Sequence, residues 1–314
     1  MNIFITGGFG YLGSHVVKLF LEDTKDKIIV GTRERKNTPQ YFKGTDIIDV
    51  NWDNLSLLKN KLTKIDLVIH LAGMNAQNCL KNPSLAQKFN ASKTKELIDI
   101  CADLKIKRFI YISTAHVYSS SLQGNVNEDS PVTNTHPYST SKREAEKYLM
   151  QMHKKNLIEG VILRLSNAYG APLDKNTDCW SLVLNDACKQ LALTNKIVLK
   201  SSGLQRRDFI TMTDASRAIK FLSQYEKLND VIYNVGGNWS PTILETIEIL
   251  RKRYFRITQK QTHLETKVDD NLSDYYLKYE IDKIKNLGFC LSENQIINSE
   301  IDGLINFCIS NFKK

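Results

Sequence analysis

Short apolar runs alternate with longer stretches of helical periodicity along most of this chain. The runs are rich in isoleucine, valine and leucine, and they are too short to be helices, so we interpret them as buried strands. The predicted strands are 2–6, 27–32, 46–50, 66–70, 108–112, 160–165, 206–212 and 231–237. Strands that alternate with helices predict a doubly wound α/β fold, in which a parallel sheet is covered on both faces.

A glycine-rich turn joins the first strand to the first helix. Gly7, Gly10 and Gly13 directly follow the strand at 2–6, and an amphipathic stretch comes next. Glycines at such a turn let the backbone bend tightly and let a pyrophosphate approach the helix N-terminus. Their spacing is one residue wider at the start than the usual Gly-x-Gly-x-x-Gly. Strand, glycine turn and helix in this order predict a Rossmann dinucleotide-binding domain.

The end of the second strand bears on which dinucleotide is bound. An acidic residue at this place would bind the 2′-hydroxyl of the adenosine ribose in NAD, whereas an arginine accommodates the 2′-phosphate of NADP. The chain has Arg33 immediately after the strand and Glu34 after that. We therefore predict NADP as the cofactor, with NAD held through Glu34 as the alternative.

The remaining elements suggest two interleaved domains. Helices are predicted at 83–104, from Tyr138 onwards, at 177–193, from a capping Asp214 to about 223, at 241–256 and at 292–312, with a loop at 119–136 and a turn at 166–172. We assign residues 1–167, with returning segments at about 206–236, to the dinucleotide-binding domain. Residues 168–205 and 237–314 would form a smaller, mixed C-terminal domain for substrate, with a cleft between the two.

Tyr138 and Lys142 form a Tyr-x-x-x-Lys pattern at the start of a strongly helix-forming stretch that follows Pro137. A spacing of four places both side chains on one face of the helix. A nearby lysine cation favours the phenolate and lowers the tyrosine pKa from about 10. Such a tyrosine can take a proton from an alcohol or return one to a ketone. The pattern is short, and a surface helix that happens to carry both residues is the alternative.

Composition narrows the class of protein. The chain has 314 residues, of which 42% are hydrophobic and 25% charged, which is typical of a globular protein with a large core. We see no membrane-spanning run and no basic leader before the first strand, and the six cysteines form no Cys-x-x-Cys pair. We therefore expect a cytoplasmic protein with reduced thiols, no metal site and no membrane partner. The net charge of +9 is scattered, which favours anionic small ligands over nucleic acid.

Several ordered blocks together resemble the extended short-chain dehydrogenase/reductase family of the NAD-dependent epimerase/dehydratase type. The blocks are residues 6–13, 70–73, 112–118, 138–142, 164–170, 207–210, 233–236 and 281–289. They are collinear with the family over nearly the whole chain. Members of this family include nucleotide-sugar epimerases, dehydratases and reductases, so the resemblance implies a nucleotide-diphosphate sugar as substrate and commonly a homodimer.

The resemblance also implies roles for particular residues. Tyr138 would be the general acid/base, and Lys142 would lower its pKa and bind the nicotinamide ribose. Thr114 would hydrogen-bond the reacting oxygen, and Asn90 would support the lysine unless it merely caps or kinks its helix. The cofactor is expected to contact Gly7, Gly10, Tyr11, Leu12, Gly13, Arg33, Asp49, Val50, Leu71, Ala72, Gly73, Tyr138 and Lys142. The substrate is expected to contact Thr114, His116, Asn167 and Arg207.

Two of these substrate contacts would hold the diphosphate. Asn167 and Arg207 stand where nucleotide-sugar enzymes of the family bind it, and a guanidinium fork suits phosphate oxygens. The alternative is that Arg207 pairs with a surface carboxylate.

The chain departs from the family pattern after the expected catalytic threonine. Family dehydratases carry an acid pair there, but this chain has Ala115 and His116, so dehydration is disfavoured. His116 resembles the side chain with which GDP-fucose synthase epimerises carbons beside a keto group; alternatively, it only lines the pocket. Ser119 replaces the glycine that often follows Val-Tyr, which changes the substrate loop.

The function that the resemblance implies is hydride transfer between NAD(P) and carbon 4, or a neighbouring carbon, of a nucleotide-linked sugar. The enzyme would be a 4-epimerase or a 4-keto reductase. A non-catalytic NADP-sensing regulator on the same fold is the alternative, although a sensor has no need of an acid/base.

Overall fold

The chain forms two compact units, and the computed structural model describes residues 1–23, 25–33, 39–267 and 275–313. The first unit comprises Met1–Ser120, Glu128–Leu165 and Ser216–Asn234, and the second comprises Ser121–Asn127, Ser166–Ala215 and Val235–Lys314.

Two segments that the sequence placed in the first domain, 121–127 and 206–215, pack with the second unit instead. The reason is strand pairing: each contains a short strand whose partner lies in that unit.

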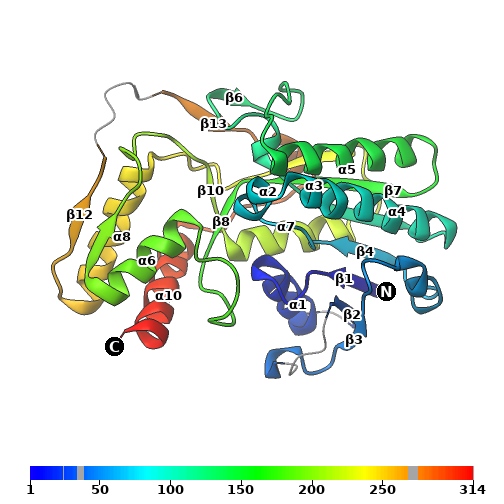
Figure 1. The fold of residues 1–314 in the computed structure, drawn as a ribbon, viewed down its shortest axis with the longest axis horizontal. Coiled ribbons are helices and arrows are strands. Elements are labelled where there is room, and N and C mark those ends of the chain that lie inside the picture. Colours follow the sequence, from blue (N-terminus) through cyan, green and yellow to red (C-terminus); the bar gives the residue numbers. More distant parts are fainter. Residues whose placement is uncertain (24, 34–38, 268–274, 314) are drawn as a thin grey trace. The chain divides into compact units, whose positions relative to one another are not determined.

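The first unit is built on a seven-stranded sheet, which confirms the predicted Rossmann fold (Figure 1). The strands in spatial order are β11 (Ile232–Val235), β7 (Glu159–Leu165), β5 (Arg108–Thr114), β4 (Leu67–His70), β1 (Asn2–Thr6), β2 (Lys27–Thr32) and β3 (Asp46–Asp49). Pairing is parallel from β7 through to β3. The chain runs outwards from β1 in both directions, and such a switch point is where doubly wound sheets bind ligands.

Helices cover both faces of this sheet, because its strands are apolar on both sides. All seven residues of β5 are buried, for example. Figure 1 shows α4 and α5 along one face, and α1 and α7 along the other. The helical segments are α1 (Tyr11–Asp23), η1 (Gln40–Phe42), η2 (Leu55–Lys61), α2 (Ala76–Lys81), α3 (Pro83–Ala86), η3 (Gln87–Ser92), α4 (Lys93–Asp103), η4 (Ala115–Val117), α5 (Pro137–Lys154) and α7 (Met212–Gln224).

The predicted helix at 83–104 is interrupted by a π-helical turn, η3. A π turn inserts an extra residue and redirects the side chains around it, and such turns are frequent at functional sites. The redirected residues include Asn90, which is 1% exposed. Hydrophobic periodicity alone could not reveal this turn, because the residues on both sides remain helical.

The second unit combines three small parallel strand pairs with a helical layer. Its strands are β6 (Gly124–Val126) with β13 (Leu277–Tyr279), β8 (Asn167–Tyr169) with β10 (Phe209–Thr211), and β9 (Lys196–Val198) with β12 (His263–Glu265). Its helices are α6 (Val183–Thr194), α8 (Ile243–Thr258), α9 (Asp282–Asn286) and α10 (Asn294–Phe312). Helices α6, α8 and α10 pack against one another around an apolar core.

Several local predictions for this unit were wrong in detail. The predicted loop at 119–136 contains β6, and the predicted turn at 166–172 contains β8. The predicted helix at 177–193 begins only at Val183. Helix α7 is capped by the Thr211 hydroxyl, which accepts a hydrogen bond from the backbone N–H of Asp214 at 3.0 Å. The Asp214 carboxylate instead accepts hydrogen bonds from Ser292.

Within the described ranges, no helix combines the length and the apolar character needed to cross a membrane.

Candidate active site

Helix α5 places the Tyr-x-x-x-Lys pair at the carboxyl end of β5. The helix begins at Pro137, where the missing N–H of proline costs nothing. The Nδ1 atom of His136 accepts a hydrogen bond from the backbone N–H of Tyr138 at 3.2 Å and so caps the helix. This cap fixes the first turn, and Tyr138 and Lys142 then lie one turn apart on the side that faces the sheet.

The Tyr138 phenol lies near the hydroxyl of Thr114, the last residue of β5, and this hydroxyl favours the ionised form of the phenol. The Thr114 hydroxyl accepts a hydrogen bond from the backbone N–H of His116 at 3.2 Å, which holds it at the strand end. The structure thus brings together the expected acid/base and the expected hydroxyl that would bind the reacting oxygen. Sequence predicted both residues, although they are 24 positions apart.

Lys142 is held beneath this pair. Its side chain is buried, and its ammonium group donates a hydrogen bond to the carbonyl of Ile112 at 2.9 Å. The Nζ atom lies 4.9 Å from the ring centroid of Tyr111 and 6.0 Å from that of Tyr138. Burial lowers the pKa of Lys142 to about 8, which leaves the ammonium form predominant at neutral pH.

The arrangement of these side chains does not lower the pKa of Tyr138, as the sequence predicted, but raises it. Burial raises the pKa of Tyr138 to about 12, the neighbouring thiol of Cys79 adds to this, and the nearby Thr114 hydroxyl opposes it. The phenol is therefore held in its protonated form. Desolvation is the largest influence on this phenol, and it cannot be judged from the spacing of two residues along a helix.

Asn90 connects the π turn to this site. Its Nδ2 atom lies 3.2 Å from the Ser141 hydroxyl and 3.4 Å from the Cys79 sulfur, and its Oδ1 atom accepts a hydrogen bond from the backbone N–H of Met74 at 2.8 Å. Its contacts are with residues around Lys142 rather than with Lys142 itself. Asn90 therefore ties α5 to the segment that follows β4, and its expected support of the lysine stays a prediction.

That segment contains Gly73, around which the side chains of Lys142 and Asn90 pack closely. A Cβ atom added there would lie 3.2 Å from Nζ of Lys142 and 3.3 Å from Oδ1 of Asn90. The neighbouring Ala72 donates its backbone N–H to the Thr6 hydroxyl at 3.3 Å, which anchors the segment to the end of β1. Leu71, Ala72 and Gly73 are thus placed where the cofactor was expected, at the switch point of the sheet.

The backbone carbonyl of His116 binds two side chains near the expected site. Its carbonyl accepts hydrogen bonds from Asn134 Nδ2 at 2.7 Å and from the Ser139 hydroxyl at 2.9 Å. Its side chain is partly exposed in the short helix η4, directly after Thr114. His116 therefore directly follows Thr114 in the chain, and the expected contact of its side chain with substrate stays a prediction.

The glycine turn between β1 and α1 fits a dinucleotide pyrophosphate. Gly7 has a φ of +72°, which L-residues rarely adopt, and an added Cβ would lie 2.7 Å from the backbone nitrogen of Ala72. An added Cβ on Gly13 would overlap the carbonyl oxygen of Gly7 and lie 2.9 Å from Cα of Gly8. The helix and the turn are therefore in backbone contact, and no side chain blocks the N-terminus of α1 at these positions. Tyr11 and Leu12 form the first turn of this helix.

The end of β2 carries the residues expected to contact the adenosine. Arg33 is exposed directly after the strand, and Glu34, the alternative NAD ligand, lies outside the described residues. On the adjacent strand Asp49 is exposed and pairs in register with Thr32, and Val50 is buried, with its N–H bonded to the carbonyl of Thr32 at 2.7 Å.

Replacing Arg33 by alanine should weaken NADP binding more than NAD binding. A charge-assisted hydrogen bond to the 2′-phosphate contributes roughly 1.5–3 kcal/mol, and NAD lacks that phosphate. Titrating both cofactors against wild type and Arg33→Ala measures the difference. Arg256→Ala, which removes an exposed arginine from α8, is the control. An equal loss for both cofactors would place Arg33 outside the 2′-phosphate site.

The two residues expected to bind diphosphate lie together in the second unit. Asn167 and Phe209 are in register between β8 and β10, so Arg207 comes just before the paired residues. The Asn167 side chain donates a hydrogen bond to the carbonyl of Asp208 at 2.9 Å. The buried Asp208 carboxylate accepts backbone hydrogen bonds from Gly237 and Trp239, which fixes the segment that carries Arg207.

The Arg207 guanidinium itself has no hydrogen bond or ion pair with any residue in the described part of the chain. Burial lowers its pKa, and the Tyr275 phenol opposes this. The alternative that it neutralises a surface carboxylate therefore finds no support among the described residues. A partly buried guanidinium of this kind is suited to bind an anionic ligand.

Comparison with known proteins identifies the family. The model of the NAD dependent epimerase/dehydratase family matches residues 3–236, which is most of the chain. The chain belongs to this family, as the sequence blocks indicated.

The relatives of this chain include both kinds of enzyme after which the family is named, epimerases and dehydratases. A dTDP-D-glucose 4,6-dehydratase of Bos taurus is 26% identical over 315 residues, which cover 92% of this chain and 83% of the relative. A putative UDP-glucose 4-epimerase of Methanocaldococcus jannaschii is 26% identical over 256 residues, which cover 79% and 81% of the two chains.

Solved structures confirm the fold. A UDP-N-acetylglucosamine 4-epimerase from Methanobrevibacter ruminantium, in complex with UDP-N-acetylmuramic acid, has a TM-score of 0.82 at 22% identity over 98% of both chains. A UDP-glucuronic acid 4-epimerase from Bacillus cereus, in complex with UDP-glucuronic acid and NAD, has a TM-score of 0.81 at 22% identity over 99% of both chains.

Sequence reasoning missed three residues that surround the expected site. Ser113, Glu146 and Arg164 form a buried polar cluster next to Lys142. One signal was available: Glu146 lies four positions after Lys142 and eight after Tyr138, hence on the same face of α5. Because that face of α5 is buried, a glutamate on it could have been singled out as a candidate residue near the expected site.

Proposed function

We propose that this protein is an NAD(P)-dependent 4-epimerase or 4-keto reductase of a nucleotide-linked sugar, with Tyr138 as the acid/base. The observation that carries the proposal is that Tyr138 lies beside the buried, protonated Lys142 and near the Thr114 hydroxyl at the carboxyl end of β5. Dinucleotide binding by itself requires neither a phenol paired with a hydroxyl nor a lysine cation below it. The arrangement therefore favours an enzyme over the alternative of a sensing regulator.

The roles of the residues follow from this arrangement. Gly7, Gly10, Gly13 and Gly73 would admit the cofactor, and NAD(P) bound there would supply the hydride chemistry at the sugar carbon. Thr114 would orient the oxygen on that carbon by a hydrogen bond. At the same oxygen, Tyr138 takes the proton when the alcohol becomes a ketone and returns it when the alcohol re-forms.

Lys142 would act mainly by its charge. A cation below the phenol stabilises the phenolate that exists after Tyr138 has lost its proton. The pKa of Tyr138, raised to about 12 by burial, makes the protonated phenol the resting form, and this form can donate to a developing alkoxide. The resting protonation state of Tyr138 therefore favours the direction of reaction that begins from a ketone.

The residues after Thr114 argue against dehydration. Removing water from the sugar requires an acid and a base, and Ala115 supplies neither, while His116 supplies one titratable group. We accordingly place the chain with the epimerases and reductases, although its relatives include 4,6-dehydratases.

The experiment is a substrate panel read by mass spectrometry and NMR. The purified protein is incubated with UDP-, GDP-, CDP- and dTDP-hexoses and their 4-keto derivatives, with NAD+ or NADPH. A product of unchanged mass with inverted carbon 4 would identify an epimerase, and reduction of the keto sugar would identify a reductase. Loss of water would overturn the argument from Ala115, and cofactor binding without turnover would favour the regulator. Tightly retained NAD+ after purification would fit an epimerase, and exchangeable NADPH a reductase.

Replacing Arg207 by leucine should raise KM for the sugar nucleotide far more than it lowers kcat. The diphosphate does not change its charge during hydride transfer, so Arg207 would bind ground state and transition state about equally. Steady-state kinetics at several salt concentrations measure this, and salt should weaken binding to wild type more than to the variant.

The matched control for that experiment is Arg206→Leu. Arg206 is the neighbouring residue, but it donates hydrogen bonds to the carbonyl of Ser240 and to Glu245, so its charge is already paired. Its replacement should leave KM nearly unchanged. A lower kcat with unchanged KM for Arg207→Leu would place Arg207 near the reacting carbon and would weaken the nucleotide-sugar assignment.

A further inference from the structure

Three consecutive residues at the end of β5 contact three residues that are spaced by four along α5. The Ile112 carbonyl accepts a hydrogen bond from Lys142, the Ser113 hydroxyl donates one to Glu146, and the Thr114 hydroxyl lies near the Tyr138 phenol. The expected catalytic helix therefore faces the strand at each of three successive turns and is hydrogen-bonded to it at two of them. The first two turns carry the expected chemistry, and the third carries a carboxylate that has no role in it.

Glu146 is the most enclosed of these side chains. It is fully buried, and each of its carboxylate oxygens accepts hydrogen bonds from the guanidinium of Arg164, with an Nη2–Oε2 distance of 2.7 Å and an Nε–Oε1 distance of 3.2 Å. Arg164 lies on β7 and pairs in register with Ser113 on β5. Helix α5 is thus fixed to two adjacent strands through one carboxylate.

Arg164 is itself fixed on its other sides. Its guanidinium carbon lies 4.7 Å from the ring centroid of Tyr118, and its Nη1 atom donates to the carbonyl of Glu128 at 3.4 Å. The Tyr118 hydroxyl donates to the side chain of Asn234 at 2.7 Å. The cation therefore has little freedom to follow α5 if the helix rotates.

Net stability alone does not explain such a pair. Burying two charges costs about as much as their attraction returns, and apolar residues of the same volume are often equally stable. What a bidentate Arg–Glu pair provides beyond packing is one defined geometry, because the planar guanidinium accepts its partner only in a narrow range of positions.

We propose that Glu146 is a positioning residue, which Ser113 and Arg164 hold so that α5 presents Lys142 and Tyr138 to the end of β5 in one orientation. This role rests on the proposed function of Lys142 and Tyr138. Glu146 acts through these two residues and does not touch the substrate itself.

The charge of Glu146 has a second, measurable consequence for Lys142. The titratable groups that face Lys142 from the elements around it are His70 on β4, Cys79 on α2, Tyr111 on β5, and Tyr138 and Glu146 on α5 itself. Burial lowers the pKa of Lys142, and Cys79 and then Glu146, which is the carboxylate among these groups, raise it against that lowering. Removing the charge should therefore lower the pKa of Lys142, by about one unit for an opposite charge one helical turn away.

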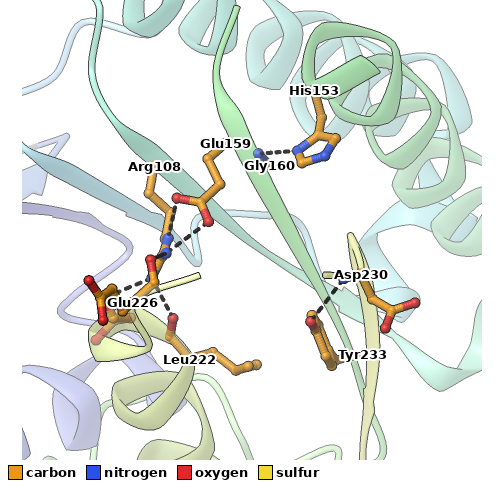
Figure 2. Close-up of polar contacts among 9 residues, drawn as sticks. Arg108, His153, Glu159, Gly160, Leu222, Glu226, Asp230 and Tyr233 are labelled. Carbon is orange, nitrogen blue, oxygen red and sulfur yellow. Dashed lines mark hydrogen bonds and ion pairs between the residues drawn. The ribbon is translucent and has the colours of Figure 1, made fainter. Parts of the chain in front are cut away.

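A matched control pair lies on the same two strands, at their opposite ends. Figure 2 shows Arg108 at the start of β5, with its guanidinium on the carboxylate of Glu159 at the start of β7. The Arg108 side chain is also buried, and it also donates to backbone carbonyls, those of Leu222 and Ser223. This pair has the same chemistry and joins the same strands, but it does not touch α5 residues of the expected site.

The experiment compares Glu146→Gln with Glu159→Gln. The titration of Lys142 is followed by NMR of 13C-labelled lysine, with its signal assigned by its loss in Lys142→Met, and thermal unfolding is measured in parallel. Both variants leave a buried arginine without its carboxylate, so both should be destabilised. We expect the Lys142 midpoint to fall by about one unit in Glu146→Gln only. Equal midpoints in the two variants would overturn the proposal.

A second pair of variants covers the case in which Glu146→Gln does not fold. Arg164→Lys and Arg108→Lys each keep the cation but lose the bidentate fork. On the substrate found in the panel, we expect kcat of Arg164→Lys to fall by about 10- to 100-fold with little change in KM, as a small misplacement of reacting groups does. Arg108→Lys should be unchanged, and equal kcat values in the two would contradict a positioning role.

These readouts separate the inference from the proposed function. The Lys142 titration requires no substrate, so a shifted midpoint without turnover of any sugar nucleotide would retain the positioning role and reject the function. If the protein turns over a sugar nucleotide but the Arg164→Lys and Arg108→Lys variants behave identically, the proposed function is retained and the positioning role is rejected.

Discussion

Tyr138→Phe should lose most of the turnover of this protein and retain its fold and cofactor binding. The substitution removes one hydroxyl, which in the structure lies near Thr114 at the end of β5. General acid/base catalysis by a positioned side chain contributes typically about 10²–10⁴-fold, and we expect a loss in that range in kcat. Because the ring remains, the contact of Lys142 with its face is kept. Steady-state kinetics, cofactor titration and thermal unfolding measure the three quantities.

The control is Tyr148→Phe on the same helix. The Tyr148 hydroxyl donates to Asp99 of α4, away from β5, so its loss removes the same atom from the same helix without touching the expected site. Its turnover should stay near that of wild type. If Tyr138→Phe also keeps near-normal turnover, the assignment of the proton donor is wrong, and with it the mechanism that we propose.

Gly13→Ala should disrupt the dinucleotide-binding turn. The added Cβ would overlap the carbonyl oxygen of Gly7, and the atoms around it are backbone, 2.8 Å and 2.9 Å away, which cannot rotate aside as a side chain can. Forcing atoms into a packed site typically costs about 1–3 kcal/mol, and here the strain falls on the turn that would hold the pyrophosphate. We expect a lower melting temperature together with loss of NAD(P) binding, measured by thermal unfolding with and without cofactor.

Gly303→Ala is the matched substitution. Gly303 also lies within a helix, α10, and an added Cβ meets no atom within 4 Å. Alanine at a compatible helical position is neutral or stabilising, because the unfolded chain loses freedom. Similar unfolding temperatures for the two variants would refute the close approach of α1 to the turn. Retained cofactor affinity in Gly13→Ala would refute the pyrophosphate site.

The sequence by itself determined the framework and much of the expected site. Strands at 2–6, 27–32 and 160–165 could be located because a strand buried on both faces must be apolar throughout. The glycine turn and the pair Tyr138 and Lys142 could be recognised because both depend on short-range spacing. The same local signals, read in order, identified the family.

Tertiary structure alone decided which distant residues meet. The strands β6 and β8 were predicted as loop and turn, because three residues carry little local preference and become strands only by pairing with β13 and β10. The π turn that turns Asn90 towards Ser141 and Cys79 also leaves no local trace. Such features depend on partners tens of residues away, which no window of sequence contains.

The same limit applies to the electrostatics of the site. Spacing suggested that Lys142 lowers the pKa of Tyr138, but burial raises it to about 12, since desolvation depends on everything packed around a group. The contact of Glu146 with Ser113 and Arg164 likewise required α5 to lie across two strands. Residue types and their local spacing thus indicated which chemistry to expect of this chain. Packing decided the protonation states and the orientation in which its groups are held.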